Sequence, residues 1–299
     1  MTGPADVDLQ NAEAVEDLFR SAAEALRNAP ARKGSVHHLP ANGHLLITGD
    51  LHDHLDHWHR IMHTAQLDAS PDNHVLLQEL IHGERLVNGM DFSFRMLARV
   101  ATAVLTWPGQ VHPILGNHEL AQFTRRPVSK GAGNSVELFE DAVDWVFGDD
   151  ADAVIEAMDD FFSAMPLGVR TESGLLCTHS LPDAARMSGF DPAVLERELV
   201  LEDYQGLTGS AWMLTWGRRH DPEVLDSLAD RWKIDMFCIG HQSVPEGIRQ
   251  DGPRLVAINS DHARGVIVSL DLEHEPSPSM MVSNAVMLQT ISVPPGGDS

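Results

Sequence analysis

The stretch Leu45-Leu46-Ile47-Thr48-Gly49-Asp50-Leu51-His52 is an apolar run that ends in a polar cluster. The same arrangement returns three times further along the chain, at Gly116-Asn117-His118-Glu119, Thr178-His179-Ser180 and Gly240-His241-Gln242. Short apolar runs bounded by polar residues predict buried strands. On an extended segment, residues two apart such as Asp50 and His52 point to the same side. We therefore expect strand ends whose carboxylate, amide and imidazole groups suit hard metal ions.

Strand and helix patterns alternate in the first half of the chain. Helices are predicted over 8–28, 53–66 and 92–107, and strands over 44–48 and 74–77. Later strands are predicted as a hairpin over 168–176 and as runs over 236–239, 254–259, 265–272 and 280–292. The segment 30–40 has little pattern, and we expect a loop there. Together these patterns favour an α/β fold with mixed sheets.

The composition excludes several classes of protein. The chain has 299 residues, 43% of them hydrophobic, which is enough for one large domain. Its 44 Asp and Glu residues outnumber the 21 Lys and Arg, for a net charge of −23. Such a charge argues against nucleic acid and anionic membranes as partners. No run approaches the ~20 apolar residues of a membrane span, and the first residues have no signal-peptide pattern, so we expect a cytoplasmic protein.

The two cysteines, Cys177 and Cys238, both lie in apolar runs. Free cysteines of this kind behave as small buried hydrophobic residues. Two such positions do not indicate a disulfide framework.

The four polar clusters resemble the motifs of the calcineurin-like metallophosphoesterases, in the layout of the serine/threonine protein phosphatases and the bacteriophage lambda phosphatase. In that family the motifs run GD-x-H, GD-x-x-D-R-G, GNHE, a strand-end His and GH-Q. The resemblance spans about residues 40 to 275. It implies two mixed β-sheets packed as a sandwich and flanked by helices, in α-β-β-α layers. We expect a helical extension over 1–35, a metallophosphoesterase domain over 36–292 with a helical insertion or cap over about 120–165, and a flexible tail over 293–299.

The second motif departs from the family pattern. Aligning the strand ends places Gln78-Glu79 where the family has Gly-Asp. Glu79 is therefore the candidate for the carboxylate that bridges two metals. The alternatives are that only one metal binds tightly, or that Asp53 or Glu84 compensates.

The same motif lacks two further family residues. His82 stands where the family has the Asp that orients the catalytic His, and Gly83 stands where it has a phosphate-binding Arg. Arg85 follows two residues later. Arg218 and Arg219 lie in the segment where the family often places another such arginine, so Arg218, Arg219 and Arg85 are the candidates for binding substrate phosphate.

Residue by residue, the resemblance implies a dinuclear metal site. Asp50 and His52 bind the first metal, Glu79 bridges, and the second metal takes Asn117, His179 and His241. These ligands suit manganese, iron, zinc or magnesium, of which we favour manganese. A hydroxide shared by the metals attacks phosphorus, and His118 protonates the leaving group as general acid.

The resemblance implies a phosphatase that hydrolyses phosphomonoesters of a small molecule or of phosphoprotein serine and threonine. A nucleotide or dinucleoside polyphosphate hydrolase is the near alternative. The altered second motif leaves open another class, a metal-binding scaffold with weakened catalysis on the same fold.

Overall fold

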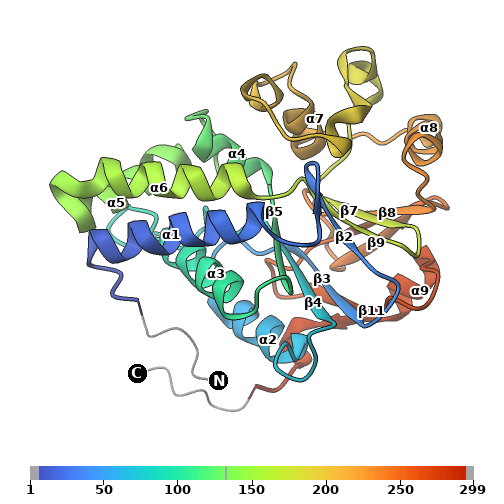
Figure 1. Ribbon diagram of the computed structural model, residues 1–299, viewed down its shortest axis with the longest axis horizontal. Coiled ribbons are helices and arrows are strands. Elements are labelled where there is room, and N and C mark those ends of the chain that lie inside the picture. Colours follow the sequence, from blue (N-terminus) through green and yellow to red (C-terminus); the bar gives the residue numbers. More distant parts are fainter. Residues whose placement is uncertain (1–6, 132, 294–299) are drawn as a thin grey trace.

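The computed structural model describes residues 7–131 and 133–293. Two mixed β-sheets face each other at its centre and helices lie around them (Figure 1). One sheet has five strands in the order β12-β11-β3-β4-β5, and the other has seven in the order β1-β2-β6-β7-β8-β10-β9. The predicted α/β fold of two mixed sheets flanked by helices is confirmed.

The five-stranded sheet carries the first motifs. Its strands are β3 (His44–Asp50), β4 (Asn73–Gln78), β5 (Val111–Ile114), β11 (Val266–Asp271) and β12 (Ala285–Met287). The strands β3, β4 and β5 are parallel, so their carboxyl ends lie at one edge. Nearly every residue of these three strands is buried, as expected for parallel strands covered on both faces.

The seven-stranded sheet carries the later motifs. Its strands are β1 (Arg32–Lys33), β2 (Val36–Leu39), β6 (Gly168–Thr171), β7 (Leu175–Thr178), β8 (Met236–Ile239), β9 (Ile248–Asp251) and β10 (Leu255–Ile258). The strands β6 and β7 form the predicted hairpin, and β7 and β8 are parallel. The predicted loop over 30–40 is wrong, because β2 pairs in parallel with β6, a partner far along the chain.

The space between the sheets is filled by apolar side chains from both. Ile47 and Leu76 come from one sheet, and Val169 and Ile258 from the other. Cys177 and Cys238 stand opposite each other on β7 and β8, and both are buried and free. Their predicted role as small buried hydrophobic residues is confirmed.

Helices lie around the two sheets (Figure 1). They are α1 (Ala12–Arg27), α2 (Leu55–Ala65), α3 (Phe94–Thr106), α4 (Asn117–Phe123), α5 (Ser135–Phe147), α6 (Ala151–Ala164), α7 (Ser210–Trp216), α8 (Pro222–Trp232) and α9 (Pro278–Ser283). The helix α9 packs against strands of both sheets. Five short 3-10 helices join them, at Gly148–Asp150, Ala184–Gly189, Pro192–Glu196, Leu201–Tyr204 and Leu288–Thr290. Within the described ranges, no helix has both the length and the apolar character needed to span a bilayer.

Two predictions concern the ends of the chain. A single strand over 280–292 is only partly right, because α9 takes the first residues and the strand is confined to β12. From residue 294 on, the predicted tail lies outside the described residues. The division into an extension, a main domain and an inserted cap stays a prediction.

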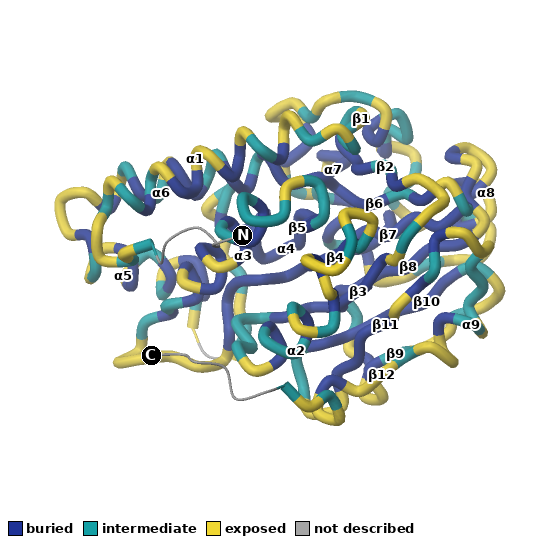
Figure 2. Tube along the Cα trace, turned by 60° about the horizontal axis from the view of Figure 1, so that its bottom comes forward, coloured by how far each residue is buried: buried dark blue, intermediate teal, exposed yellow. Residues whose placement is uncertain are grey.

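The helix α1 lies beside α6 (Figure 1) and also contacts α3. Its buried side includes Val15 and Phe19, and the ring centre of Phe19 is 5.8 Å from that of Phe161 on α6. Along α1 and α6 buried and exposed residues alternate, whereas the central strands are buried throughout (Figure 2). This packing makes α1 part of the helical layer beside the sheets.

We expect Phe19→Ala to lower the free energy of unfolding of the whole chain by about 3–5 kcal/mol, because it leaves a cavity between α1 and α6. Urea denaturation followed by circular dichroism measures this loss. Arg20→Ala is the matched control, since the Arg20 side chain is 49% exposed and its removal should change stability by no more than ~0.5 kcal/mol. An unchanged midpoint for Phe19→Ala would mean that α1 contributes nothing to the main fold.

Candidate metal centre

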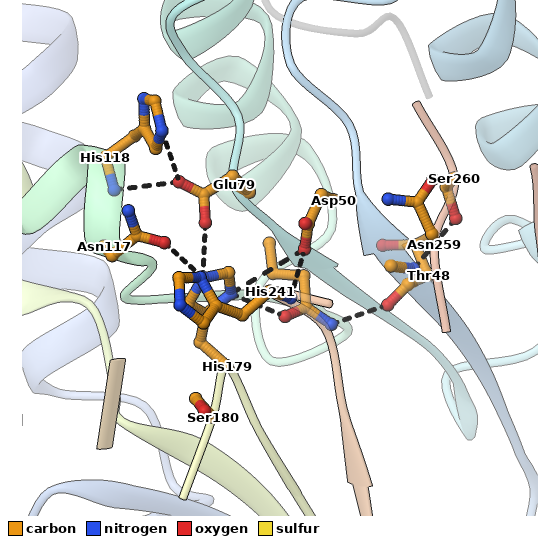
Figure 3. A network of polar contacts seen from close by, with 12 residues as sticks. Thr48, Asp50, Glu79, Asn117, His118, His179, Ser180, His241, Asn259 and Ser260 are labelled. Carbon is orange, nitrogen blue, oxygen red and sulfur yellow. Dashed lines mark hydrogen bonds and ion pairs between the residues drawn. The ribbon is translucent and has the colours of Figure 1, made fainter. Parts of the chain in front are cut away.

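Five strand ends supply the candidate site. Asp50 and Gln78 end β3 and β4, and Asn117 begins α4 shortly after β5. From the other sheet, His179 directly follows β7 and His241 closely follows β8. Figure 3 shows the side chains of Asp50, Asn117, His179 and His241 converging from both sheets. A sandwich whose parallel strands end together therefore gathers residues that are far apart in sequence.

Backbone contacts hold the loops of the site together. The His52 N–H donates to the Glu79 carbonyl at 2.7 Å, which joins the first motif to the second. The His241 N–H donates to Asp50 Oδ1 at 2.9 Å, which joins the two sheets. His52, Glu79 and His241 have φ of 44°, 50° and 59°, a left-handed conformation that is uncommon for residues other than glycine. Such strain concentrates at functional sites, where the surrounding structure enforces it.

The glycine of the last motif is required by close packing. A Cβ atom at Gly240 would lie 2.4 Å from both Asp50 Oδ1 and Gln78 Oε1. Any side chain at Gly240 would therefore displace the groups that the strand end brings together.

Glu79, His179 and Asn117 meet at the centre of the site. His179 Nε2 contacts Glu79 Oε2 and lies 2.9 Å from Asn117 Oδ1 (Figure 3). One ligand atom each from Glu79, His179 and His241 all lie within 4.8 Å of one another. All three residues are buried.

The protonation of His179 follows from its neighbour Gln78. The Gln78 side-chain N–H donates to the Thr48 carbonyl at 2.8 Å, so Oε1 is the atom that faces His179. Oε1 accepts from His179 Nδ1–H at 2.9 Å. A neutral His179 therefore presents the lone pair of Nε2 to the Glu79 carboxylate and the Asn117 carbonyl, with no proton between these acceptors.

This arrangement fits a metal cation. Among the described residues, Glu79 Oε2 and His241 Nε2 are buried without a hydrogen-bond partner. Buried acceptors that face one another repel unless a cation or a proton lies between them. The set of carboxylate, amide and imidazole ligands suits manganese, iron, zinc and magnesium.

A second group of ligand atoms lies on the other side of Glu79. One atom each from His52, Glu79 and His118 lie within 4.8 Å of one another. His52 Nδ1–H donates to the Ile81 carbonyl at 3.0 Å, which leaves Nε2 available as a ligand atom. Glu79 takes part in both groups, as a bridging carboxylate must. Asp53 and Glu84, the alternatives to Glu79, are in neither group of the described residues.

The carboxyl groups of the site are costly to ionise together. Burial raises the pKa of Asp50 to about 7, that of Glu79 to about 8 and that of Glu119 to about 7. The charge of Glu79 adds to the rise for both Asp50 and Glu119. At neutral pH this cluster favours a bound cation.

Two residues of the site had no predicted role. Glu119 Oε1 accepts from the backbone N–H groups of Leu80 at 2.6 Å and Ile81 at 3.2 Å, which holds the loop after Glu79 against α4. Gln78 orients His179 through the bond described above. The GNHE motif contains Glu119 and the second motif contains Gln78, but only the fold shows what each side chain contacts.

A series of hydrogen bonds runs from His118 through His82 and Gln122 to Glu140, away from the candidate metal ligands. His118 Nδ1 lies 2.9 Å from His82 Nδ1, and His82 Nε2 lies 3.0 Å from Gln122 Oε1. Gln122 Nε2 donates to Glu140 Oε1 at 3.2 Å, so Gln122 Oε1 must accept from His82 Nε2–H. His82 Nδ1 then accepts from His118 Nδ1–H. This order leaves His118 Nε2 as the atom free to exchange a proton.

The candidate phosphate-binding arginines are not equivalent in the structure. Arg218 Nη1 donates to the His241 carbonyl at 3.0 Å, which places this side chain beside the site. All three arginines are exposed, but among the described residues no hydrogen bond or ion pair links the side chain of Arg219 or Arg85 to the candidate metal ligands. Only Arg218 is therefore brought to the site.

Comparison with known proteins identifies the family. The sequence model of the calcineurin-like phosphoesterases matches residues 43–245, which hold all the motifs described above. The chain belongs to the calcineurin-like phosphoesterase family. This family hydrolyses phosphoric esters, and the predicted resemblance is confirmed.

Known calcineurin-like phosphoesterases resemble the chain over most of its length. The chain is 24% identical over 239 residues to a probable serine/threonine-protein phosphatase of Encephalitozoon cuniculi. This match covers 76% of the chain and 48% of that protein. The chain thus spans about half the length of this curated relative.

Two solved structures share the fold. A protein serine/threonine phosphatase from Saccharomyces cerevisiae with similarity to human phosphatase PP5 superposes with a TM-score of 0.60 at 13% identity, covering 93% of this chain and 89% of that one. A cold-active protein-tyrosine phosphatase of a Shewanella species superposes with a TM-score of 0.55 at 12% identity, and the match covers 84% of this chain and 80% of that one.

Removing metal should make stability fall as the pH rises. The folded pKa values of Asp50 and Glu79, about 7 and 8, lie above the ~4 of unfolded carboxyls. Between pH 5 and 8 the unfolded chain therefore releases protons that the metal-free folded chain retains, which favours unfolding. Buried histidines with lowered pKa values, such as His82 and His118, oppose this trend at pH 5, because the unfolded chain protonates them there. We therefore expect metal-free protein to melt at a lower temperature at pH 8 than at pH 7, where these histidines no longer contribute, and added manganese to raise the melting temperature most at pH 8.

Glu79→Gln is the control for this pH dependence, because it removes the carboxyl with the highest of these pKa values. Differential scanning calorimetry of metal-free wild type and variant should give a flatter pH dependence for the variant. Equal pH dependence in the two proteins would contradict the assignment to Glu79.

Proposed function

We propose that this protein is a metal-dependent phosphatase that hydrolyses phosphomonoesters, including those of phosphoserine and phosphothreonine. One observation carries the proposal: the buried lone pairs of Glu79, His179 and His241 converge within 4.8 Å, and Glu79 also groups with His118. A site of this kind combines metal ligands with a residue that can transfer a proton.

The proposed ligands divide into two sets that share Glu79. Asp50 and His52 hold the first divalent ion, and Asn117, His179 and His241 hold the second. Manganese is our first choice for both positions. When bound, two such ions lower the pKa of a shared water and neutralise charge on the phosphoryl group.

The chain's own residues then orient the substrate and supply a proton. His118 donates Nδ1–H to His82, so its Nε2 faces the substrate side as the proposed general acid. Burial, followed by the neighbouring rings of His52 and His82, lowers the pKa of His118 well below its usual value. A lowered pKa leaves His118 neutral near pH 7 with a lone pair on Nε2, so as general acid it must first take up a proton there, which it then passes to the leaving alkoxide. Arg218, held by the His241 carbonyl, adds a cation for the phosphoryl oxygens.

The substrate class rests on the curated relative. That protein is named a probable serine/threonine-protein phosphatase, which supports phosphorylated serine and threonine side chains as substrates here. A strongly acidic protein also favours substrates with one phosphate over polyanions, because like charges repel.

The first test compares wild type with His118→Ala and Glu79→Ala on phenyl phosphate, whose poor leaving group needs a proton, with added manganese. His118→Ala should keep two metals and lose about 10²–10⁴-fold in kcat, the usual contribution of a general acid. Glu79→Ala should bind at most one metal tightly and be inactive, because among the described residues Glu79 is the carboxylate that belongs to both groups of ligand atoms. Metal content is read by plasma mass spectrometry.

The two variants test separate parts of the proposal. If metal-loaded wild type hydrolyses no faster than His118→Ala, the protein is a scaffold and the enzymatic function is wrong. If Glu79→Ala binds two metals and remains fully active, Glu79 is not the bridge.

The second test concerns His82 as the residue that positions His118. His82→Ala should lower kcat about 10–100-fold for phenyl phosphate and only a few-fold for p-nitrophenyl phosphate, because a good leaving group needs little protonation. His74→Ala is a suitable control, since His74 is a buried histidine that bonds to His112 and does not contact His118. Equal losses on the two esters would show that His82 serves only the packing of the site.

A further inference from the structure

One of the few lysines of this acidic chain pairs with a carboxylate on a segment beside the candidate site. The sequence contains only Lys33, Lys130 and Lys233, and Lys33 and Lys233 are exposed. Lys130 is partly buried, with 24% of its side chain accessible, and its Nζ lies 2.5 Å from Asp261 Oδ2. Its backbone N–H donates to Ser135 Oγ at 3.0 Å, at the start of α5. Lys130 is therefore held at both its backbone and its ammonium group.

Asp261 places this ion pair beside the metal ligands. It follows Ser260, whose N–H donates to the carbonyl of Asp50 at 3.2 Å, and Asn259 pairs with Asp50 in an isolated bridge. The Asp261 N–H donates to Asn259 Oδ1 at 3.1 Å, which fixes the turn. The carboxylate that holds Lys130 thus lies on the segment next to Asp50.

The charge of Lys130 affects the pKa values of three residues of the site, His52, Glu79 and His118. Burial has the largest effect on the pKa of His52, Glu79 and His118, and the charge of Lys130 lowers the pKa of each. Arg218 lowers the pKa of Glu79, His179 and His241 in addition to the effect of burial. Both cations therefore act on the ligand cluster, and Glu79 is affected by each.

The second motif has no room for a cation of its own. Gly83 stands where the family has an arginine, and a Cβ atom at Gly83 would lie 2.9 Å from both Asp53 Cβ and the His52 carbonyl oxygen. Packing against the first motif therefore excludes a side chain at Gly83, and a positive group on that side must come from elsewhere in the fold.

We propose that Lys130 binds the phosphoryl group of the substrate and that Asp261 is the residue that positions it. This inference rests on the proposed phosphatase function and adds a substrate contact to it. An ammonium group donates up to three hydrogen bonds, so Lys130 can bond to a phosphoryl oxygen while it keeps its contact with Asp261. Substrate binding then draws on Lys130 from the segment after α4 and on Arg218 from the segment after α7.

The test measures KM for p-nitrophenyl phosphate and Ki for inorganic phosphate in Lys130→Met, with manganese added and metal content checked. We expect both constants to rise about 10-fold, since a hydrogen bond to a charged group contributes roughly 1.5–3 kcal/mol. Lys130→Arg, which keeps the charge, should restore both constants to within about threefold of wild type. Lys33→Met is the matched control and should leave both unchanged. KM and Ki at wild-type values in Lys130→Met would overturn the proposal.

The role of Asp261 is tested by combining variants. Asp261→Asn should raise Ki for phosphate less than Lys130→Met does, and the double variant should match Lys130→Met alone. If the two effects add instead, Asp261 does not act through Lys130 and its positioning role is wrong.

Direct phosphate binding separates this inference from the phosphatase proposal. Isothermal titration of inorganic phosphate into manganese-loaded protein should give a Kd about 10-fold higher for Lys130→Met than for wild type, whether or not either protein turns over substrate. An inactive wild type refutes the phosphatase function, whereas equal phosphate affinities in the two proteins refute the role of Lys130.

Discussion

The carboxylate of Glu79 is the contact on which the rest of the site depends. Its Oε1 accepts the backbone N–H of His118 at 2.8 Å, and its Oε2 contacts His179 Nε2 from the opposite sheet. One side chain thus joins the start of α4 to the end of β7. Because this carboxylate is buried among other acceptors, the two sheets can hold it in ionised form only with a cation beside it.

The change of Gly-Asp to Gln78-Glu79 in the second motif is accommodated by the surrounding structure. Glu79 adopts a left-handed backbone conformation, and the N–H groups of Leu51 and His52 both donate to its carbonyl. Gln78 spans from the Thr48 carbonyl to His179 Nδ1, so the larger side chain takes on the task of orienting a ligand. The substitution therefore alters the motif without disrupting the convergence of ligand atoms.

The site also differs in how its charges are arranged around the ligands. His118 bonds to a neutral imidazole, His82, where the family places a carboxylate, and the bonds of His82 run on through Gln122 to Glu140. Positive charge comes from Arg218, which donates to the His241 carbonyl, and from Lys130, which pairs with Asp261. Long segments that connect strands thus supply the two cations that we propose for binding the phosphoryl group.

The local sequence was sufficient to predict the strands that carry the motifs and the fold class, because apolar runs encode buried strands. The motif resemblance added seven candidate residues for the site: Asp50, His52, Glu79, Asn117, His118, His179 and His241. The sequence missed β2, whose hydrogen-bond partner lies far along the chain, and it did not distinguish Arg218 from Arg219, of which only Arg218 bonds to the His241 carbonyl. The roles of Gln78, Glu119 and Lys130 depend on contacts with residues tens of positions away. Tertiary structure alone decides such roles, because motif spacing determines which groups are available but only the packing of the two sheets determines which atoms face one another.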